Sequence, residues 1–226
     1  RLRADAPVVK MNVDGYDPFW VVSRHADVLT ASRANDSFLY GERQSILCDL
    51  ETDRRDQEAA GGSRKLVRTL TEMDAPEHMK YRMLTQSWFQ PKNLRQREGR
   101  IRAAARKSVD KLLAVGESCD FVADLASTYP LHIVMDILGV PVEDEPKMLE
   151  WAKQLTGEQD PDLRRDMGSD TDVHAARMAT LGEVFAYYGA LTADRRASPR
   201  DDVSSVISNA MIDGKPIVYA DFQREY

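Results

Sequence analysis

The chain has 226 residues, of which 30% are charged and 42% are hydrophobic, and its formal net charge is −6. A chain of this size buries about 70% of its unfolded surface, so it needs no disulfide or metal to hold a core. The acidic balance disfavours a dedicated nucleic-acid-binding protein. No apolar run reaches the ~18 residues of a membrane span, and the first residues lack a signal peptide's apolar core, so we expect a soluble cytoplasmic protein.

Cysteine and histidine positions argue against a metal site built from neighbouring residues. The two cysteines, Cys48 and Cys119, and the four histidines have no second cysteine or histidine at a metal-ligand spacing. Unpaired thiols in a reducing compartment are the simplest interpretation. His132 lies in the most apolar predicted helix, so we interpret it as a hydrogen-bonded core residue. The short motifs of nucleotide-binding loops, nucleophile elbows and zinc proteases are also absent.

The first third of the sequence predicts a hairpin, a short helix and a long irregular segment. β-prone runs at residues 8–13 and 19–22 flank a short turn-rich loop, which is typical of a hairpin. Residues 23–34 carry apolar side chains at roughly helical spacing. Residues 40–70 show no sustained periodicity. Long irregular segments in compact domains are usually functional, so we expect a mobile, ligand-facing loop, with a tolerated surface insertion as the open alternative.

From residue 74 onward the pattern is almost continuously helical. Helices are predicted at residues 74–90, 94–115, 130–139, 143–156, 172–194 and 201–211. A brief strand at 119–122, a polar loop at 157–171, a turn or small hairpin at 212–217 and a helix that begins at 219 complete the pattern. The helix at 130–139 is apolar nearly all round, so we expect it to be buried. We expect one domain over residues 1–226, mainly α with a small β-sheet.

The helix that begins near residue 74 carries the first candidate site. Asp74 is a predicted acidic N-cap, with Pro76 in the first turn and Glu77 at the third position, as in a capping box. His78 and Arg82 lie one turn apart, so both side chains project from the same stripe. Together with the positive end of the helix they offer several donors to one anion. An exposed helix face with incidental charges is the alternative that spacing alone favours.

Residues 92–107 form a strongly basic stretch in this acidic protein. Against the single acid Glu98 they contain Lys92, Arg95, Arg97, Arg100, Arg102, Arg106 and Lys107. Such a helix indicates an acidic partner that it would attract by electrostatic steering. A solvated helix face is equally compatible with the charge pattern. Nucleic acid is the weaker partner, because no aromatic side chain interleaves with the basic ones.

Several stretches resemble a known family when they are taken in order. Residues 73–82, with the pattern D-A-P-x-H-x-x-x-R, and the aromatic-Pro helix end at 88–91 resemble helix C of bacterial cytochromes P450. Residues 19–28 resemble the family's first sheet and helix B, 130–141 resemble helix E with its L-G-V-P exit, and 197–203 resemble the segment leading into helix H. The chain is identified as a member of this family, and its nearest branch resembles the soluble bacterial enzymes typified by the α-terpineol hydroxylase.

The resemblance implies roles for individual residues around a haem b cofactor. His78 and Arg82 would donate hydrogen bonds to a haem propionate and would not bind the iron. Phe89 would touch the porphyrin face. Leu70 and Thr71, at the end of the irregular segment, would contact both haem and substrate. The irregular segment itself would then be the family's B–C loop, which determines substrate specificity.

Further implied sites lie in the rest of the chain and beyond it. Leu155 and Thr156, near the end of the helix similar to helix F, would be additional substrate contacts. The basic helix would face an acidic ferredoxin, with docking candidates Arg95, Arg100, Arg102 and Arg106. The family's acid–Thr pair, its E-x-x-R motif and its thiolate cysteine would lie beyond Tyr226. Neither Cys48 nor Cys119 has the surroundings of that ligand, so no catalytic or metal-binding residue is expected in this N-terminal half of the P450 fold.

The implied activity is that of a haem-thiolate monooxygenase. It would hydroxylate a small hydrophobic substrate, a terpenoid or an aromatic or alicyclic hydrocarbon, with O2 and electrons from NAD(P)H through ferredoxin reductase and ferredoxin. The cofactor would supply the difficult chemistry, and the protein would supply orientation and exclusion of water. We expect a monomer that binds neither membrane nor nucleic acid. The alternative from a different class is a non-catalytic helical binding module, whose basic helix binds an acidic protein or nucleic acid.

Overall fold

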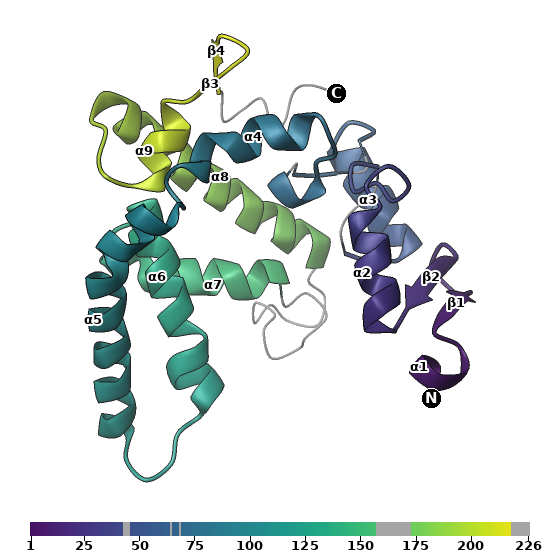
Figure 1. Ribbon diagram of the computed structural model, residues 1–226, viewed down its shortest axis with the longest axis horizontal. Helices are drawn as coiled ribbons and strands as arrows, with labels where there is room; N and C mark the ends of the chain where they lie inside the picture. Colours follow the sequence, from purple (N-terminus) through teal and green to yellow (C-terminus); the bar gives the residue numbers. More distant parts are fainter. Residues whose placement is uncertain (43–45, 64, 68, 157–172, 218–226) are drawn as a thin grey trace. The chain divides into compact units, whose positions relative to one another are not determined.

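The structure is a computed structural model, and it describes residues 1–42, 46–63, 65–67, 69–156 and 173–217. In this part of the chain, residues 1–82 form one compact unit and residues 83–217 form another. Helices predominate in both units, and each unit has one small antiparallel hairpin, as expected for a mainly α protein (Figure 1). The predicted loop at 157–171 and the helix predicted from 219 lie outside the described residues.

The first unit begins with a short helix and the predicted hairpin. Its elements are α1 (Leu2–Asp5), β1 (Val8–Met11), β2 (Phe19–Val22), α2 (His25–Arg33), α3 (Leu50–Ala59), the 3-10 turn η1 (Leu70–Glu72) and the first half of α4 (Glu77–Gln86). The two strands pair in antiparallel register, from Val8 opposite Val22 to Met11 opposite Phe19. The sequence therefore predicted the hairpin and α2 correctly, because both have clear turn and periodicity signals.

Helix α3 corrects the expectation of an irregular segment over residues 40–70. It begins after Asp49, whose Oδ1 accepts hydrogen bonds from the backbone nitrogens of Glu51 (3.0 Å) and Thr52 (2.9 Å). The N–H donated by Thr52 is the main cause that lowers the pKa of the Asp49 carboxyl. Most side chains of this helix are charged or polar, so it has no apolar stripe for a periodicity search to find.

The second unit is a set of packed helices followed by the second hairpin. Its elements after the end of α4 are α5 (Pro91–Val115), the π-helical turn η2 (Val122–Ala126), α6 (Thr128–Leu138), the 3-10 turn η3 (Val142–Asp144), α7 (Glu145–Thr156), α8 (Val173–Ala197), α9 (Val203–Ser208), β3 (Met211–Ile212) and β4 (Lys215–Pro216). Helices α5 and α6 lie side by side, and α6 contacts α7, α7 contacts α8, and α8 contacts α9 (Figure 1). These helices match the predicted ones closely.

The strand predicted at residues 119–122 is wrong. Asp120 accepts hydrogen bonds through its Oδ1 from the backbone nitrogens of Val122 and Ala123, both at 3.0 Å. These bonds satisfy the first free N–H groups of a helical turn, so the chain enters η2 there and does not extend. The β-prone side chains of this stretch favour a strand, but the capping carboxylate of Asp120 directs the chain into a helical turn.

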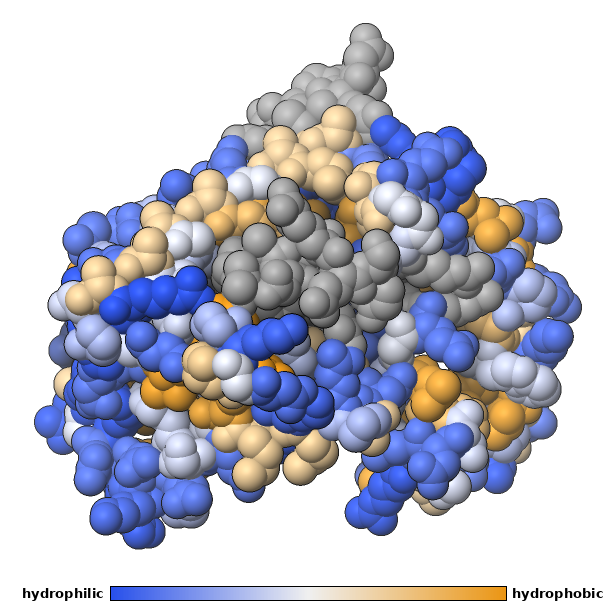
Figure 2. Space-filling model, turned by 90° about the horizontal axis from the view of Figure 1, so that it is seen from above, coloured by the Kyte–Doolittle hydropathy of each residue, from blue (hydrophilic) through white to orange (hydrophobic). Residues whose placement is uncertain are grey.

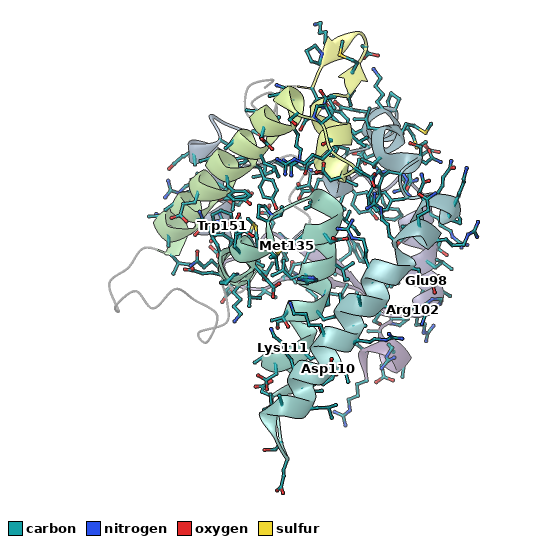
Figure 3. All side chains as sticks on the ribbon, turned by 90° about the vertical axis from the view of Figure 1, so that its left-hand side faces the viewer. Glu98, Arg102, Asp110, Lys111, Met135 and Trp151 are labelled. Carbon is teal, nitrogen blue, oxygen red and sulfur yellow. The ribbon has the colours of Figure 1, made fainter. Side chains whose placement is uncertain are left out.

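The core of the second unit lies where α6, α7 and α8 meet. Met135, Val140, Met148 and Trp151 are buried there, with two tyrosines, a valine and a leucine of α8 packed against them. Figure 3 shows Met135 and Trp151 among these packed side chains. The expectation that α6 is buried all round is only partly met, since Met135 is buried but Val134 is 49% exposed.

A buried ion pair joins the ends of three helices in this unit. Arg195 of α8 is 1% exposed, and its Nε donates to Oδ2 of Asp202 at 2.7 Å. The same guanidinium donates to the backbone oxygen of Gly139, at the C-terminus of α6, at 2.5 Å. Asp202 caps α9 by accepting from the Ser205 nitrogen at 2.6 Å. Charge and hydrogen bonds are therefore satisfied together, which a buried pair requires.

Hydrophilic residues dominate the face that Figure 2 shows, with hydrophobic patches between them. Large apolar side chains are exposed in both units, among them Ile46 in the first and Leu113 in the second. Among the residues that the structure describes, no helix combines the length and the apolar character needed to cross a membrane.

Candidate functional site

Helix α4 carries the predicted anion-binding pair. The backbone nitrogen of His78 donates to the backbone oxygen of Asp74 at 2.9 Å, which closes the first turn of the helix. His78 is half-buried and Arg82 is exposed, and their separation of one turn puts both on one face. Within the described part of the chain, neither side chain has a hydrogen bond or an ion pair. Their donors are thus available to a carboxylate from outside these residues.

Asp74 does not act as the predicted cap of α4. Its carboxylate accepts hydrogen bonds from the backbone nitrogens of Tyr40 (2.9 Å) and Gly41 (2.7 Å), more than thirty residues earlier. These two N–H groups, the Tyr40 group foremost, and the nearby charge of Lys65 hold the pKa of the Asp74 carboxyl below its ordinary value. The capping-box prediction is therefore corrected, because the carboxylate binds a distant segment and not the first turn of its own helix.

Lys65 completes this arrangement from the opposite side. Its Nζ donates to the backbone oxygens of Tyr40 (2.7 Å) and Glu72 (2.9 Å). We call Lys65, Asp74 and the dipeptide Tyr40-Gly41 the clasp. Sequence reasoning missed it, because no motif relates a lysine to backbone groups so far away along the chain.

Leu70 and Thr71 lie just before the clasp's Asp74, in the turn η1. Leu70 is 36% exposed and Thr71 is also exposed, whereas Met73 is buried. The hydroxyl oxygens of Thr69 and Thr71 lie 2.9 Å apart, within hydrogen-bond distance. The two predicted contact residues therefore face outward from a segment that is anchored at its base.

A hollow of about 660 Å³ adjoins the clasp in the first unit. Its volume is in the range of small-molecule sites. Its walls include Gly41, Lys65 and residues 72–77, but none of the predicted site residues. The structure thus places the predicted contacts outside this hollow.

Phe89 lies in the second unit, just after α4. It is 45% exposed, and its ring makes a T-shaped contact with the Trp88 ring, with centroids 5.1 Å apart. Trp88 is buried, with the guanidinium carbon of Arg97 4.0 Å from its ring centroid. The buried Trp88 thus holds the base of Phe89, and the exposed part of Phe89 is available to an apolar ligand.

Several arginines of the basic helix α5 are neutralised by acidic partners in the structure. Arg97 is buried and paired with Asp201 Oδ1 at 2.9 Å, and Arg100 pairs with Asp136 of α6. Arg102 pairs with Glu98 at 2.7 Å on the outer side of α5 (Figure 3). The docking candidates that keep no ion pair with a described residue are Arg95 and Arg106, both exposed.

The other predicted site residues lie at the end of α7. Leu155 is half-buried, and Thr156 is exposed with its hydroxyl donating to the Ala152 oxygen at 2.6 Å. Neither cysteine forms a disulfide; Cys48 is half-buried and Cys119 is exposed. In the described ranges, no group of three or more His, Cys, Asp or Glu side chains could hold a metal ion.

Comparisons with known proteins identify the family of the chain. No family model matches the chain. It is 38% identical over 219 residues to cytochrome P450-terp of Pseudomonas sp., covering 96% of this chain and 51% of that protein. It is 32% identical over 206 residues to the steroid C26-monooxygenase of Rhodococcus jostii (strain RHA1), covering 91% of this chain and 40% of that protein.

Solved structures give the same answer. CYP108D1 of Novosphingobium aromaticivorans matches with a TM-score of 0.84 and 41% identity, over 98% of this chain and 51% of that one. Cytochrome P450 CYP268A2 of Mycobacterium marinum, in complex with pseudoionone, matches with a TM-score of 0.81 and 28% identity, over 98% of this chain and 52% of that one. The fold of the chain is that of the cytochrome P450 structures that it matches.

The chain belongs to the cytochrome P450 family. It spans about half the length of the curated relatives that it matches. Family membership implies a haem cofactor. The free donors of His78 and Arg82 on one face of α4 fit the carboxylate of such a group, because a charge-assisted pair of donors is what a propionate needs in a protein.

Proposed function

We propose that this chain is part of a haem-thiolate monooxygenase that hydroxylates a small hydrophobic substrate. Its substrate would be a terpenoid or an aromatic or alicyclic hydrocarbon. Two relatives support this class of substrate. One is cytochrome P450-terp, and the other is cytochrome P450 CYP268A2, whose structure was solved in complex with pseudoionone. Electrons would come from NAD(P)H through ferredoxin reductase and ferredoxin. The enzyme is further proposed to be monomeric and cytoplasmic, as the sequence predicts.

The observation that carries the proposal is the pair of unpartnered donors on α4. In a chain of this family, His78 and Arg82 would hold a haem propionate by charge-assisted hydrogen bonds. Arg82 would neutralise the carboxylate, and His78 would fix its direction from the half-buried side of the helix. Phe89 would cover part of the porphyrin with the exposed part of its ring. The bound haem would supply oxygen activation, and the protein would orient the substrate and exclude water.

Substrate would meet the protein at Leu70 and Thr71 of η1 and at Leu155 and Thr156 of α7. The apolar side chains would bury hydrophobic surface of the substrate. The Thr156 hydroxyl already donates within its helix, so it would offer only acceptor capacity to a ligand. The thiolate ligand of the iron is expected outside these residues, since neither cysteine lies among acceptable surroundings.

The primary test uses the full-length protein. Reduced under carbon monoxide, it should show the Soret shift typical of a thiolate-ligated haem. A full-length protein without that band contradicts the monooxygenase, and the non-catalytic helical module then becomes the better explanation.

A second test addresses the propionate contacts. Arg82→Ala should raise the rate of haem transfer to apomyoglobin by roughly ten- to a hundredfold, because one charge-assisted hydrogen bond contributes about 1.5–3 kcal/mol. The control is Arg33→Ala, which removes an exposed arginine at the end of α2 in the same unit. Equal haem-loss rates in Arg82→Ala, Arg33→Ala and wild-type protein would reject the role of Arg82.

A further inference from the structure

The clasp binds both backbone polar groups of Tyr40, each with a side chain of opposite charge to the other. The backbone oxygen of Tyr40 accepts from Lys65 Nζ at 2.7 Å, and its backbone nitrogen donates to Asp74 Oδ1 at 2.9 Å. The next nitrogen, that of Gly41, donates to Asp74 Oδ2 at 2.7 Å. Hydrogen bonds to charged groups are the stronger kind, so this dipeptide is a firm anchor for both side chains.

Lys65 also closes the segment that follows it. Its Nζ donates to the Glu72 oxygen at 2.9 Å, so the two ends of residues 65–72 are held together. Leu70 and Thr71 lie inside this closed segment and are exposed, whereas Met73 at its base is only 5% exposed. The segment therefore presents two side chains to the outside and fixes its own base.

Gly41 shows that the contact depends on close approach of the backbone. A Cβ atom at this position would lie 2.6 Å from Asp74 Oδ2, which is closer than real Cβ contacts. A larger residue at this position would force the Asp74 carboxylate to shift from its place beside the two nitrogens. Asp74 is in addition linked to α4, because its backbone oxygen accepts a hydrogen bond from the backbone nitrogen of His78 at 2.9 Å. One residue thus connects the presented segment to the helix that carries His78.

We propose that Lys65 and Asp74 are positioning residues that set where Leu70 and Thr71 meet the substrate. This inference rests on the proposed function, and it adds two residues that touch neither haem nor substrate. A contact segment that is ordered before binding loses less conformational freedom when the ligand arrives, so the clasp raises affinity for ligands that reach the segment. It leaves unchanged the binding of ligands too small to reach it.

The experiment compares two probes in the full-length haem protein. Imidazole binds a haem iron and extends little beyond it, whereas phenylimidazole binds through the same kind of nitrogen and adds an apolar ring. Their dissociation constants are read from the haem absorbance. Lys65→Met keeps the length of the side chain and removes its donors. Lys65→Arg keeps donors for both backbone oxygens, and Lys10→Met makes the same change at an exposed lysine of β1.

We expect Lys65→Met to weaken phenylimidazole binding by roughly fivefold, about the effect of immobilising one more side chain, with imidazole binding unchanged. Lys65→Arg should restore most of the affinity, and Lys10→Met should behave as wild type. Amide hydrogen exchange at Tyr40 and Gly41 should become faster in Lys65→Met and in Asp74→Asn, because both variants loosen the clasp.

Each other outcome is decisive. Faster exchange with unchanged phenylimidazole binding would make the clasp purely structural and overturn the inference. Equal weakening of both probes would place the effect at the haem and would also overturn it. A wild-type protein without the thiolate-type band under carbon monoxide would overturn the proposed function, and the positioning role with it, even if exchange at Tyr40 and Gly41 responds as expected.

Discussion

Replacing Gly139 by alanine tests the buried ion pair at the end of α6. Gly139 has φ 69°, in the left-handed region that favours glycine. A Cβ there would lie 2.1 Å from Asp202 Oδ2 and 2.8 Å from the Cβ of Asp202. The contact with the Asp202 Cβ cannot be relieved by turning the carboxylate about its own bond. The Asp202 residue as a whole must therefore move away from Arg195.

The expected loss of stability has two parts. The left-handed backbone costs a non-glycine residue about 1–2 kcal/mol. Displacing Asp202 leaves the guanidinium of Arg195 buried without its partner, and breaking such a pair costs about 3–5 kcal/mol. The sum, about 4–7 kcal/mol, is a large share of the roughly 5–15 kcal/mol that a folded domain has in total. We therefore expect Gly139→Ala to lower the stability of the full-length protein severely.

The assay is a double-mutant cycle measured by urea unfolding with far-UV circular dichroism. In an Asp202→Gly background neither the carboxylate nor its Cβ is left to displace, so Gly139→Ala should cost only the backbone share, about 1–2 kcal/mol. Gly214→Ala is the matched control, because this glycine has φ 78° and nothing lies within 4 Å of its would-be Cβ. Equal losses from Gly139→Ala in both backgrounds would refute the reasoning.

Two further predictions concern charges in the second unit. Arg106→Glu should weaken ferredoxin-supported turnover and change its salt dependence more than Arg100→Glu does, because Arg100 is already paired with Asp136; equal effects would contradict this. Burial raises the pKa of Asp202, but hydrogen bonds from Ser205 and Arg195 lower it more, so the net pKa is below its ordinary value. The folded state therefore gains stability above the ordinary carboxyl pKa of about 4 and loses it as the pH falls further. As the pH is lowered, the urea midpoint should fall less steeply in Asp202→Asn than in wild type. Parallel curves of urea midpoint against pH would contradict this.

Local signals in the sequence were sufficient for most of the fold. The hairpin of β1 and β2 and the long helix α5 have patterns that burial imposes on neighbouring residues, and the structure confirms both. Helix α3 was missed because its signal is a capping Asp49 and not an apolar stripe. The strand at residues 119–122 was wrong for the same reason, since Asp120 caps a helical turn. At both places the missed signal was a carboxylate that accepts from backbone nitrogens, that of Asp49 and that of Asp120.

The candidate site could be predicted only where its residues are close in sequence. The separation of His78 and Arg82 is enough to place them on one helix face. Lys65 and Tyr40 are 25 residues apart, and the contact between Arg100 and Asp136 spans 36 residues. Such partners depend on how the chain returns on itself, and one sequence without a structure does not contain that information in its spacing. The roles of His78 and Arg82 toward haem stay predictions.

The pairing of arginines separates those that hold the fold from those available to a ligand. Arg97 and Arg195 are buried with acidic partners, so their charges stabilise the folded chain and cannot attract anything from outside. Arg82 is exposed and has no ion pair within the described residues, although the protein as a whole has a surplus of acidic side chains. A guanidinium that is exposed to water carries little energetic cost. When a carboxylate binds it beside the half-buried imidazole of His78, water leaves the contact, and the attraction between the two charges becomes stronger. Arg82 is for this reason better suited to a propionate than any of the buried arginines.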